Sequence, residues 1–209
     1  IRRPPRSTLS SSSAASDVYK RQYIYYMNLT GQFLISMPSL EDDRFEKTVI
    51  YMCAHSKDGA MGIIINKKID YDLYPDLLEQ LGIDKPLEDK KLYIRYGGPV
   101  ESGRGFVLHS DEVIQKETLT IDKGVALTST SEFFEDLSKG NGPKNSILAL
   151  GYAGWGPGQI EKELASNSWM TLKANSDFIF DEKVNNKWND AFNLLGIDAS
   201  KLSIFSGSC

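Results

Sequence analysis

Cysteine and histidine are scarce in this chain, with two of each among 209 residues. Two cysteines, Cys53 and Cys209, cannot build a disulfide framework. The chain has no HExxH or CxxC pattern, so its two histidines belong to no recognisable zinc ligand set. The sequence therefore predicts neither a metal site nor a bound cofactor.

Long apolar runs are absent as well. The longest lies near residues 61–66, with the sequence MGIIIN. It is far shorter than the roughly 20 apolar residues that a membrane-spanning helix needs. Together with the low cysteine content, this predicts a cytoplasmic protein that makes no use of a membrane.

The chain has no excess of positive charge. It carries 24 basic and 28 acidic residues, a formal net charge of −4. Five of those basic residues and one acidic residue lie in residues 1–22, so the remainder has 19 basic and 27 acidic residues and a net charge of −8. Charges of both signs are interspersed, as on an ordinary solvated surface. Such a surface repels nucleic acid, so direct nucleic-acid binding is disfavoured.

The first 22 residues, IRRPPRSTLSSSSAASDVYKRQ, differ from the rest in composition. They resemble the in-frame translation of an adapter used to prepare sequencing libraries. An Arg- and Ser-rich, acid-poor segment is also typical of an organelle transit peptide, and a natural tail is a third reading. We expect residues 1–26 to be a non-native or disordered extension and residues 27–209, from Met27 onward, to be a single domain.

Short segments rich in β-branched residues alternate with turn signals after Met27, which indicates many short strands. Fewer segments show helical periodicity. Strands are predicted at 31–39, 48–56, 60–69, 91–100, 103–110, 117–122, 125–130, 145–155 and 177–180, and helices at 71–83, 133–140, 157–167 and 184–197. A helix over 133–140 has Ser129 at the capping position. Neighbouring strands joined by short turns predict an α+β fold, with a mixed, largely antiparallel sheet flanked by helices.

Four segments together resemble the YqgE/AlgH family of bacterial proteins. They are FLISMPSLEDDRFEKTVIYMCAHSKDGAMGIIINK (33–67), YGGPVESGRGFVLH (96–109), ALGYAGWGPGQIEKEL (149–164) and SW (168–169). The resemblance extends over residues 27–209. It implies a cytosolic protein with a bent sheet partly closed into a barrel. The biochemical activity of that family is not established. Some members carry the label of transcriptional regulator, which names no mechanism, and the net negative charge favours an indirect regulatory role.

The segment GYAGWGPGQIEKEL raises the question of a phosphate-binding loop. Its glycines do not fit the G-x-G-x-x-G spacing, and no Lys-Ser/Thr pair follows as a P-loop requires. The helix after Pro157 could hold an anion at its N-terminus, but Glu161 and Glu163 already satisfy the helix dipole. A strand-to-helix corner with Trp155 packed over it is the better interpretation.

The segment GGPVESGRGFVLH offers a candidate pocket. Gly97 and Gly98 permit close backbone approaches, while Arg104 and His109 flank a short strand. An arginine beside a histidine suits anion binding or acid–base chemistry, whereas the alternative is a purely structural hairpin. The predicted pocket is lined by Asn66, Gly97, Gly98, Arg104, His109 and Trp155.

Cys53 and His55 lie two positions apart on a predicted strand, which places them on the same face. A Cys–His pair can produce a nucleophilic thiolate. Residues i and i+2 are about 6.5 Å apart along a strand, which is long for a direct hydrogen bond. The alternative is that Cys53 is a small core residue.

Taken together, the sequence predicts a non-enzymatic regulatory module that binds a small anionic ligand or a protein partner. The alternative is an enzyme of unknown reaction, which would use Arg104 and His109 or the pair Cys53 and His55.

Overall fold

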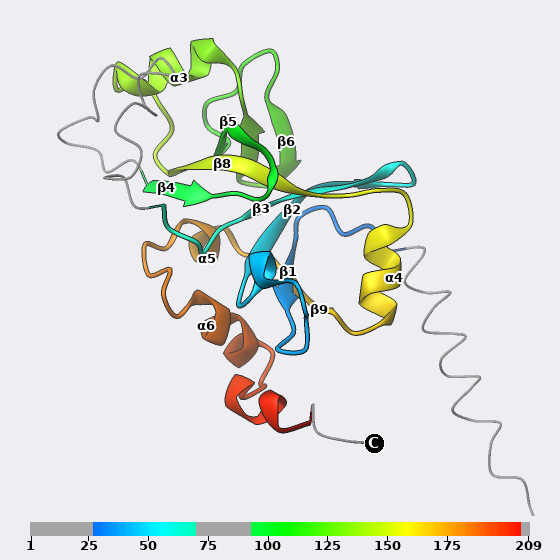
Figure 1. Cartoon of the computed structure of the whole chain (residues 1–209). Coiled ribbons are helices and arrows are strands. Elements are labelled where there is room, and N and C mark those ends of the chain that lie inside the picture. The colour runs from blue at the N-terminus through cyan, green and yellow to red at the C-terminus, as the bar shows by residue number, and fades with distance from the viewer. Residues whose placement is uncertain (1–26, 70–92, 206–209) are drawn as a thin grey trace, which may run out of the picture.

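The computed structural model describes residues 27–69 and 93–205, which contain nine strands and four α-helices (Figure 1). The strands are β1 (Gln32–Ser36), β2 (Val49–Ser56), β3 (Gly59–Ile64), β4 (Tyr93–Tyr96), β5 (Val100–His109), β6 (Leu119–Asp122), β7 (Val125–Thr128), β8 (Ser146–Trp155) and β9 (Trp169–Lys173). The helices are η1 (Asp43–Phe45), α3 (Ser131–Ser138), α4 (Gln159–Ala165), α5 (Ser176–Phe180), α6 (Lys187–Leu194) and η3 (Ala199–Phe205). The helix predicted at 71–83 lies outside the described residues.

The nine strands join one sheet in the order β6-β7-β5-β8-β3-β2-β1-β9, with β4 paired to β8 beside this path. The β4–β8 pairing is parallel, and the pairings along the main path are antiparallel. This confirms the predicted α+β fold with a mixed, largely antiparallel sheet. The expected partial closure into a barrel is not confirmed, because no pairing among the described strands joins β6 to β9 at the two ends of this order.

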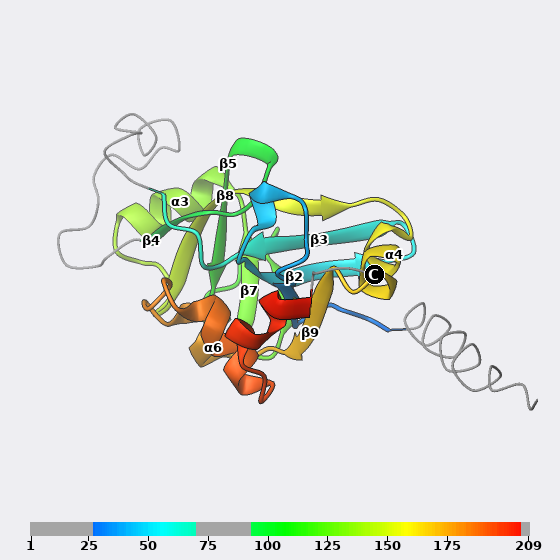
Figure 2. The same cartoon turned by 60° about the horizontal axis from the view of Figure 1, so that its bottom comes forward.

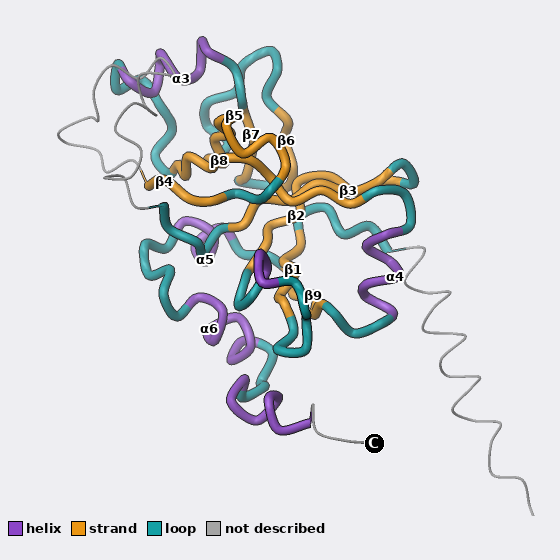
Figure 3. The backbone as a smooth tube through the Cα atoms, in the orientation of Figure 1, coloured by secondary structure: helices purple, strands orange, loops and turns teal. Residues whose placement is uncertain are grey.

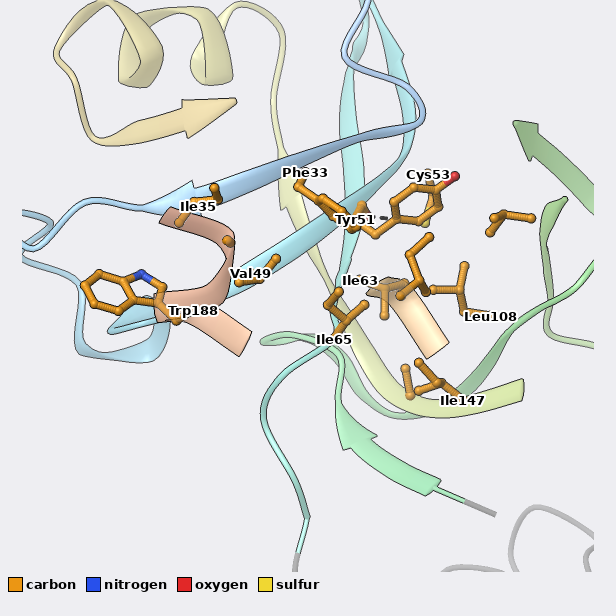
Figure 4. Close-up of a cluster of buried hydrophobic side chains, with 14 of the residues drawn as sticks. Phe33, Ile35, Val49, Tyr51, Cys53, Ile63, Ile65, Leu108, Ile147 and Trp188 are labelled. Atoms are coloured by element: carbon orange, nitrogen blue, oxygen red, sulfur yellow. Dashed lines mark hydrogen bonds between the residues drawn. The ribbon is translucent and has the colours of Figure 1, made fainter. Parts of the chain in front are cut away.

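One face of the sheet forms the largest buried cluster, together with α5, α6 and η3 (Figure 4). Alternate strand residues reach this face, because successive side chains of a strand point to opposite sides. Figure 1 shows α5 and α6 on this side of the sheet. The sheet contributes Phe33, Ile35, Val49, Tyr51, Cys53, Ile63, Ile65, Phe106, Leu108, Val125, Leu127, Ile147 and Ala149, and the helices contribute Ile179, Trp188, Ala191, Phe192 and Ala199.

The opposite face is covered in two parts. Phe133, Phe134 and Leu137 of α3 pack on β5 and the first half of β8. Ile160 of α4 packs with residues of β1, β2 and β3 and with the end of β8. Figure 3 shows α4 at the end of the sheet where β2 turns into β3. Helices α3 and α4 thus cover separate parts of this face, and a strand that packs against both helices must run from one part to the other.

Strand β8 crosses that boundary, and Gly151 interrupts its alternation. Ala149 faces the α5–α6 side, yet Trp155, also at an odd position, faces α4 on the opposite side. Gly151 has a φ of 68°, in the left-handed region that favours glycine. A Cβ atom there would lie 2.4 Å from the carbonyl oxygen of Gly98. The left-handed backbone at Gly151 therefore reverses the alternation, so that Trp155 points toward α4, and the nearby Gly98 carbonyl leaves no room for a side chain at this position.

Two segments near the C-terminus differ from the prediction. Residues 177–180 were expected to form a strand and instead belong to the helix α5, where the Asn175 side chain accepts a hydrogen bond from the Asp177 N–H at 2.9 Å. Strand β9 was not predicted, and it pairs with β1 in antiparallel register. Each element has only five residues. Such short segments show no clear periodicity, so pairing and capping decide their structure.

The α-helices are short, and α3, α4 and α6 each start within three residues of a predicted helix start. Helix α3 is capped by Thr130, whose hydroxyl accepts the Phe133 N–H, rather than by Ser129. Helix α4 follows Gly158 rather than starting at Pro157. In Figure 2, α3 and α4 lie at opposite ends of the β8 strand. No helix in the described parts of the chain is long and apolar enough to cross a membrane.

Candidate functional site

A cleft of about 960 Å³ lies between helix α4 and the loop of residues 39–45. Its walls come from this loop, which includes η1, from the start of β5, and from the connection β8–α4–β9. The lining residues are Ser39, Leu40, Glu41, Asp42, Asp43, Arg44, Phe45, Pro99, Val100, Gly154, Trp155, Gln159, Glu163, Ser168 and Trp169.

Three aromatic rings form the apolar wall of the cleft. The ring centroid of Trp169 lies 6.0 Å from that of Trp155 and 5.6 Å from that of Phe45, and both contacts are edge-to-face. Aromatic rings favour this geometry because of their charge distribution. Trp155 and Trp169 are 7% and 3% exposed. Most of each indole therefore packs into the protein, and only a small part borders the cleft.

The carboxylate of Glu163 fixes both indoles. Its Oε2 atom accepts the Nε1–H of Trp155 at 3.0 Å and the Nε1–H of Trp169 at 2.8 Å. Its Oε1 atom accepts a hydrogen bond from the Gln159 side chain at 2.9 Å. Gln159 and Glu163 are four positions apart, hence on the same face of α4. Hydrogen bonds to an ionised acceptor are stronger than neutral ones, so α4 holds the aromatic wall firmly.

The rim opposite α4 is acidic. Glu41, Asp42 and Asp43 line it together with Arg44. The Arg44 guanidinium donates to both carboxylate oxygens of Asp42, at 2.6 and 2.9 Å. These hydrogen bonds are the main cause that lowers the pKa of the Asp42 carboxyl. The positive charge of Arg44 is therefore matched within the loop, while Glu41 and Asp43 remain exposed.

Local hydrogen bonds shape the rim. Asp42 caps η1, because its carboxylate accepts the Arg44 N–H at 3.1 Å and its carbonyl accepts the Phe45 N–H at 2.9 Å. Aspartate is a favoured capping residue for this reason. The Thr48 hydroxyl donates to the Phe45 carbonyl at 3.0 Å. The loop thus presents the Phe45 ring to Trp169.

Helix α4 is tied to strand β2 by a buried imidazole–carboxylate contact. Nε2 of His55 lies 3.0 Å from Oε1 of Glu161, and Nδ1 of His55 accepts the Leu29 N–H at 3.1 Å. Because Nδ1 is an acceptor, the ring is neutral in this arrangement and Nε2 carries the proton donated to Glu161. Glu161 was expected to serve only the helix dipole, and the structure instead makes it a tertiary anchor.

Cys53 lies on the other face of the sheet from His55. The strand pairing is irregular between Met52 and Ala54, which changes the alternation of side chains. Cys53 therefore enters the α5–α6 core, where it is 1% exposed, while His55 faces α4. Burial raises the pKa of the Cys53 thiol above its ordinary value. The two residues do not share a face as the simple alternation predicts.

His109 is fully buried and hydrogen-bonded through both ring nitrogens. Its Nδ1–H donates to the Ser110 carbonyl at 2.9 Å, and Nε2 accepts the Thr128 hydroxyl at 2.9 Å. The ring also stacks on Phe133, with centroids 4.6 Å apart. Burial lowers the pKa of His109 from its ordinary value. The neutral ring thus holds β5, β7 and α3 together.

Arg104 and the two neighbouring glycines lie elsewhere. The Arg104 guanidinium is exposed and donates to the side chains of Glu101 at 3.0 Å and Ser129 at 3.1 Å. A Cβ atom at Gly97 would lie 2.2 Å from the Gly151 carbonyl oxygen, and one at Gly98 would lie 2.1 Å from the Tyr152 carbonyl carbon, both on the β8 backbone. Close backbone contact, rather than room for a ligand, accounts for this glycine pair.

Asn66 forms a turn contact beside the start of β2. Its Oδ1 atom accepts the Val49 N–H and its Nδ2 donates to the Lys47 carbonyl, both at 2.8 Å. Of the six residues predicted to line one pocket, Trp155 alone lines the cleft described above. Within residues 27–69 and 93–205, no three His, Cys, Asp or Glu side chains gather as a potential metal site.

Comparison with known proteins identifies the family. Residues 33–200 match a family model described as AlgH-like. The chain belongs to the AlgH-like family. It is 49% identical over 187 residues to a UPF0301 protein of Bradyrhizobium diazoefficiens, which covers 86% of this chain and 87% of that protein. It is 45% identical to a UPF0301 protein of Rhodospirillum rubrum, with coverage of 86% and 93%.

Two solved structures have the same fold as this chain. The solution structure of the AlgH protein from Pseudomonas aeruginosa is similar to this chain, with a TM-score of 0.72, 35% identity, and coverage of 88% of this chain and 97% of that one. A crystal structure of a Corynebacterium diphtheriae protein shares the fold at a TM-score of 0.64 and 18% identity, covering 85% and 92%. The resemblance seen in the sequence is thus confirmed.

Most of the cleft lies outside the site predicted from the sequence. Glu163 was expected only to satisfy the helix dipole, and no site was predicted in the loop of residues 39–45. A usable signal was the i, i+4 spacing of Gln159 and Glu163, which places two polar side chains beside Trp155. Strand β9 was not predicted, so the position of Trp169 next to α4 could not be inferred.

Proposed function

We propose that this AlgH-like chain is a cytoplasmic, non-enzymatic binding module with a regulatory role, and that the cleft holds a segment of a protein partner. The observation that carries the proposal is the carboxylate of Glu163, which accepts both indole N–H groups at once. Rings held in place beside an open cleft are preorganised, which reduces the entropic cost of binding. Aromatic side chains within a polar rim are typical of protein-binding surfaces.

The contacts of the reactive side chains support binding over the enzymatic alternative. Both ring nitrogens of His109 are used in hydrogen bonds inside the protein. His55 is likewise engaged, with Glu161 and with the Leu29 amide. Cys53 is buried with a raised thiol pKa, which suppresses the thiolate that a nucleophile needs. These three side chains therefore stabilise the fold, and none of them is exposed to a substrate in a cleft.

A protein segment suits the cleft better than a small anion does. The acidic residues Glu41, Asp43 and Glu163 line it, and like charges repel. The net charge of −8 over residues 23–209 also favours regulation through another protein over direct contact with DNA.

The test is a selection of random peptides displayed on phage, carried out on the immobilised full chain. A parallel selection uses Ser39→Phe, which places a ring inside the cleft, and Glu182→Phe, which places one on an exposed loop elsewhere. We expect peptides that bind the wild type and Glu182→Phe and that are lost with Ser39→Phe. Selection of no peptide that depends on the cleft contradicts the proposal.

A further inference from the structure

Acidic residues outnumber basic residues in the lining of the cleft. Its lining contains four carboxylates, those of Glu41, Asp42, Asp43 and Glu163, and a single basic side chain, Arg44. Arg44 and Asp42 form a bidentate pair, so their charges offset each other. Three acidic residues then remain along the cleft on two opposite sides, Glu41 and Asp43 on the rim and Glu163 on α4. An occupant that brings positive charge complements this surface.

Arg44 shows how a guanidinium is bound here. Its planar group meets the Asp42 carboxylate through two hydrogen bonds, at 2.6 and 2.9 Å. The same group lies 5.8 Å from the centroid of the Phe45 ring, within the range of a cation–π contact. The loop therefore already holds one arginine between a carboxylate and an aromatic ring. Glu41 and Asp43, the sequence neighbours of Asp42, are the other two acidic residues of this loop.

The aromatic wall suits the stem of such a side chain. An arginine covers apolar surface with its methylene groups while its charged end contacts carboxylates. The half-buried Phe45 ring supplies most of the apolar surface, together with the small exposed parts of Trp155 and Trp169, and Glu163 adds negative charge beside the indoles. The guanidinium is also more weakly hydrated than an ammonium group and matches a carboxylate through two bonds, so arginine fits better than lysine.

We propose that the occupant of the cleft is a basic, arginine-containing segment of a partner protein. The arginine stem lies along the aromatic wall and the guanidinium contacts Asp43 or Glu41 on the rim. This inference rests on the proposed function, since it names the chemistry of the segment that the same cleft binds. It predicts that positive charge on the segment, more than its apolar content, determines affinity.

The phage selection distinguishes the two proposals. We expect the peptides lost with Ser39→Phe to carry net positive charge and to contain arginine more often than lysine. Acidic or neutral peptides that depend on the cleft would overturn the arginine inference and leave the proposed function intact. Selection of no cleft-dependent peptide would overturn both.

A binding titration then tests whether Glu41 and Asp43 contribute to the affinity for the peptide. The most enriched peptide is labelled with fluorescein, and its affinity for the full chain is measured by fluorescence anisotropy. The double variant Glu41→Gln/Asp43→Asn should weaken binding about tenfold, because two partly exposed charge contacts are removed. The double variant Glu117→Gln/Glu182→Gln removes the same charge from exposed sites outside the cleft, and it should change the affinity less than about twofold.

Two further measurements test whether an arginine of the peptide contacts the acidic rim of the cleft. Replacing each arginine of the peptide by lysine should weaken binding by at least about threefold, since the bidentate contact is lost. Raising the salt from about 50 to about 300 mM should weaken binding by the wild type more than binding by Glu41→Gln/Asp43→Asn. Equal affinity of the two double variants would overturn the arginine inference.

Discussion

The carboxylate of Glu163 accepts the indole N–H of Trp169 at 2.8 Å, which joins helix α4 to strand β9 at the aromatic wall of the cleft. The same oxygen accepts the Trp155 N–H at the end of β8. One side chain thus fixes three successive elements, β8, α4 and β9, in the positions that form the aromatic wall. The cleft is therefore a consequence of tertiary hydrogen bonding, and its shape should depend on this carboxylate.

Replacing Glu163 by glutamine should loosen the aromatic wall. Glutamine keeps the size of the side chain but removes the charge that strengthens both indole hydrogen bonds, so we expect a loss of about 1–3 kcal/mol in the free energy of unfolding. Urea denaturation followed by tryptophan fluorescence measures the loss. Glu135→Gln is the control, because the Glu135 side chain is 60% exposed and its carboxylate forms a surface ion pair with Lys139 at 3.3 Å. Equal stability of the two variants would contradict the role given to Glu163.

The Gly98–Gly151 contact should make Gly151 unusually intolerant of substitution. Gly151→Ala introduces a left-handed alanine and a Cβ atom 2.4 Å from the Gly98 carbonyl oxygen. Gly124→Ala is the matched control, because Gly124 also has a positive φ, of 88°, but nothing lies within 4 Å of its added Cβ. We expect a cost of about 1 kcal/mol for the control and at least about 3 kcal/mol for Gly151→Ala. Thermal and urea unfolding of both variants give the comparison, and similar costs would rule out the close contact.

Lys187 should make stability rise with pH in the alkaline range. Its side chain is 1% exposed, and burial lowers the pKa of its ammonium group to about 8. Between that value and its ordinary pKa of 10.5 the unfolded chain binds more protons than the folded one, so this group adds stability as the pH rises through the window. Lys187→Met removes the contribution.

The measurement is urea unfolding of the wild type and Lys187→Met at pH 7.5 and 10. The stability difference between them should move in favour of the wild type by about 2 kcal/mol at the higher pH. Using the difference cancels other groups that titrate in the same range. Lys183→Met, at an exposed position nearby, should show no such movement.

Cys53 should react with thiol reagents only when the protein unfolds. The variant Cys209→Ser leaves Cys53 as the sole cysteine of the chain. Since the Cys53 thiol is buried and its pKa is raised, labelling by a maleimide should be absent in buffer and complete in denaturant. Rapid labelling of the folded protein at neutral pH would instead favour a reactive thiol.

Short runs of β-branched and other apolar residues bounded by turn signals were sufficient to predict most strands, because most of β1 and β2 and the second half of β5 are buried on both faces. What alternation could not predict are the places where it breaks. The irregularity after Met52 turns His55 toward α4, and Gly151 turns Trp155 toward the same helix. Both changes depend on contacts with residues distant in the sequence, so no local pattern reveals them.

The candidate site was predicted poorly for the same reason. Arg104 and His109 lie on one strand, yet the structure exposes the first and buries the second. Glu161 and Glu163 looked like ordinary acidic residues of a helix start, and their partners on β2, β8 and β9 become visible only once the sheet is formed. Trp155 was placed correctly at a packed corner because glycine and proline mark the end of its strand.

Indole signals test the binding account most directly. The chain contains three tryptophans, and the Trp188 indole N–H donates to the Ser36 carbonyl at 2.9 Å, away from the cleft lining. Trp188 is therefore an internal reference for Trp155 and Trp169. The measurement is a two-dimensional proton–nitrogen spectrum of the full chain, titrated with an arginine-containing peptide from the selection. We predict that the indole signals of Trp155 and Trp169 shift together with saturation while that of Trp188 stays in place. A peptide that binds without moving either signal of the cleft would contradict the account.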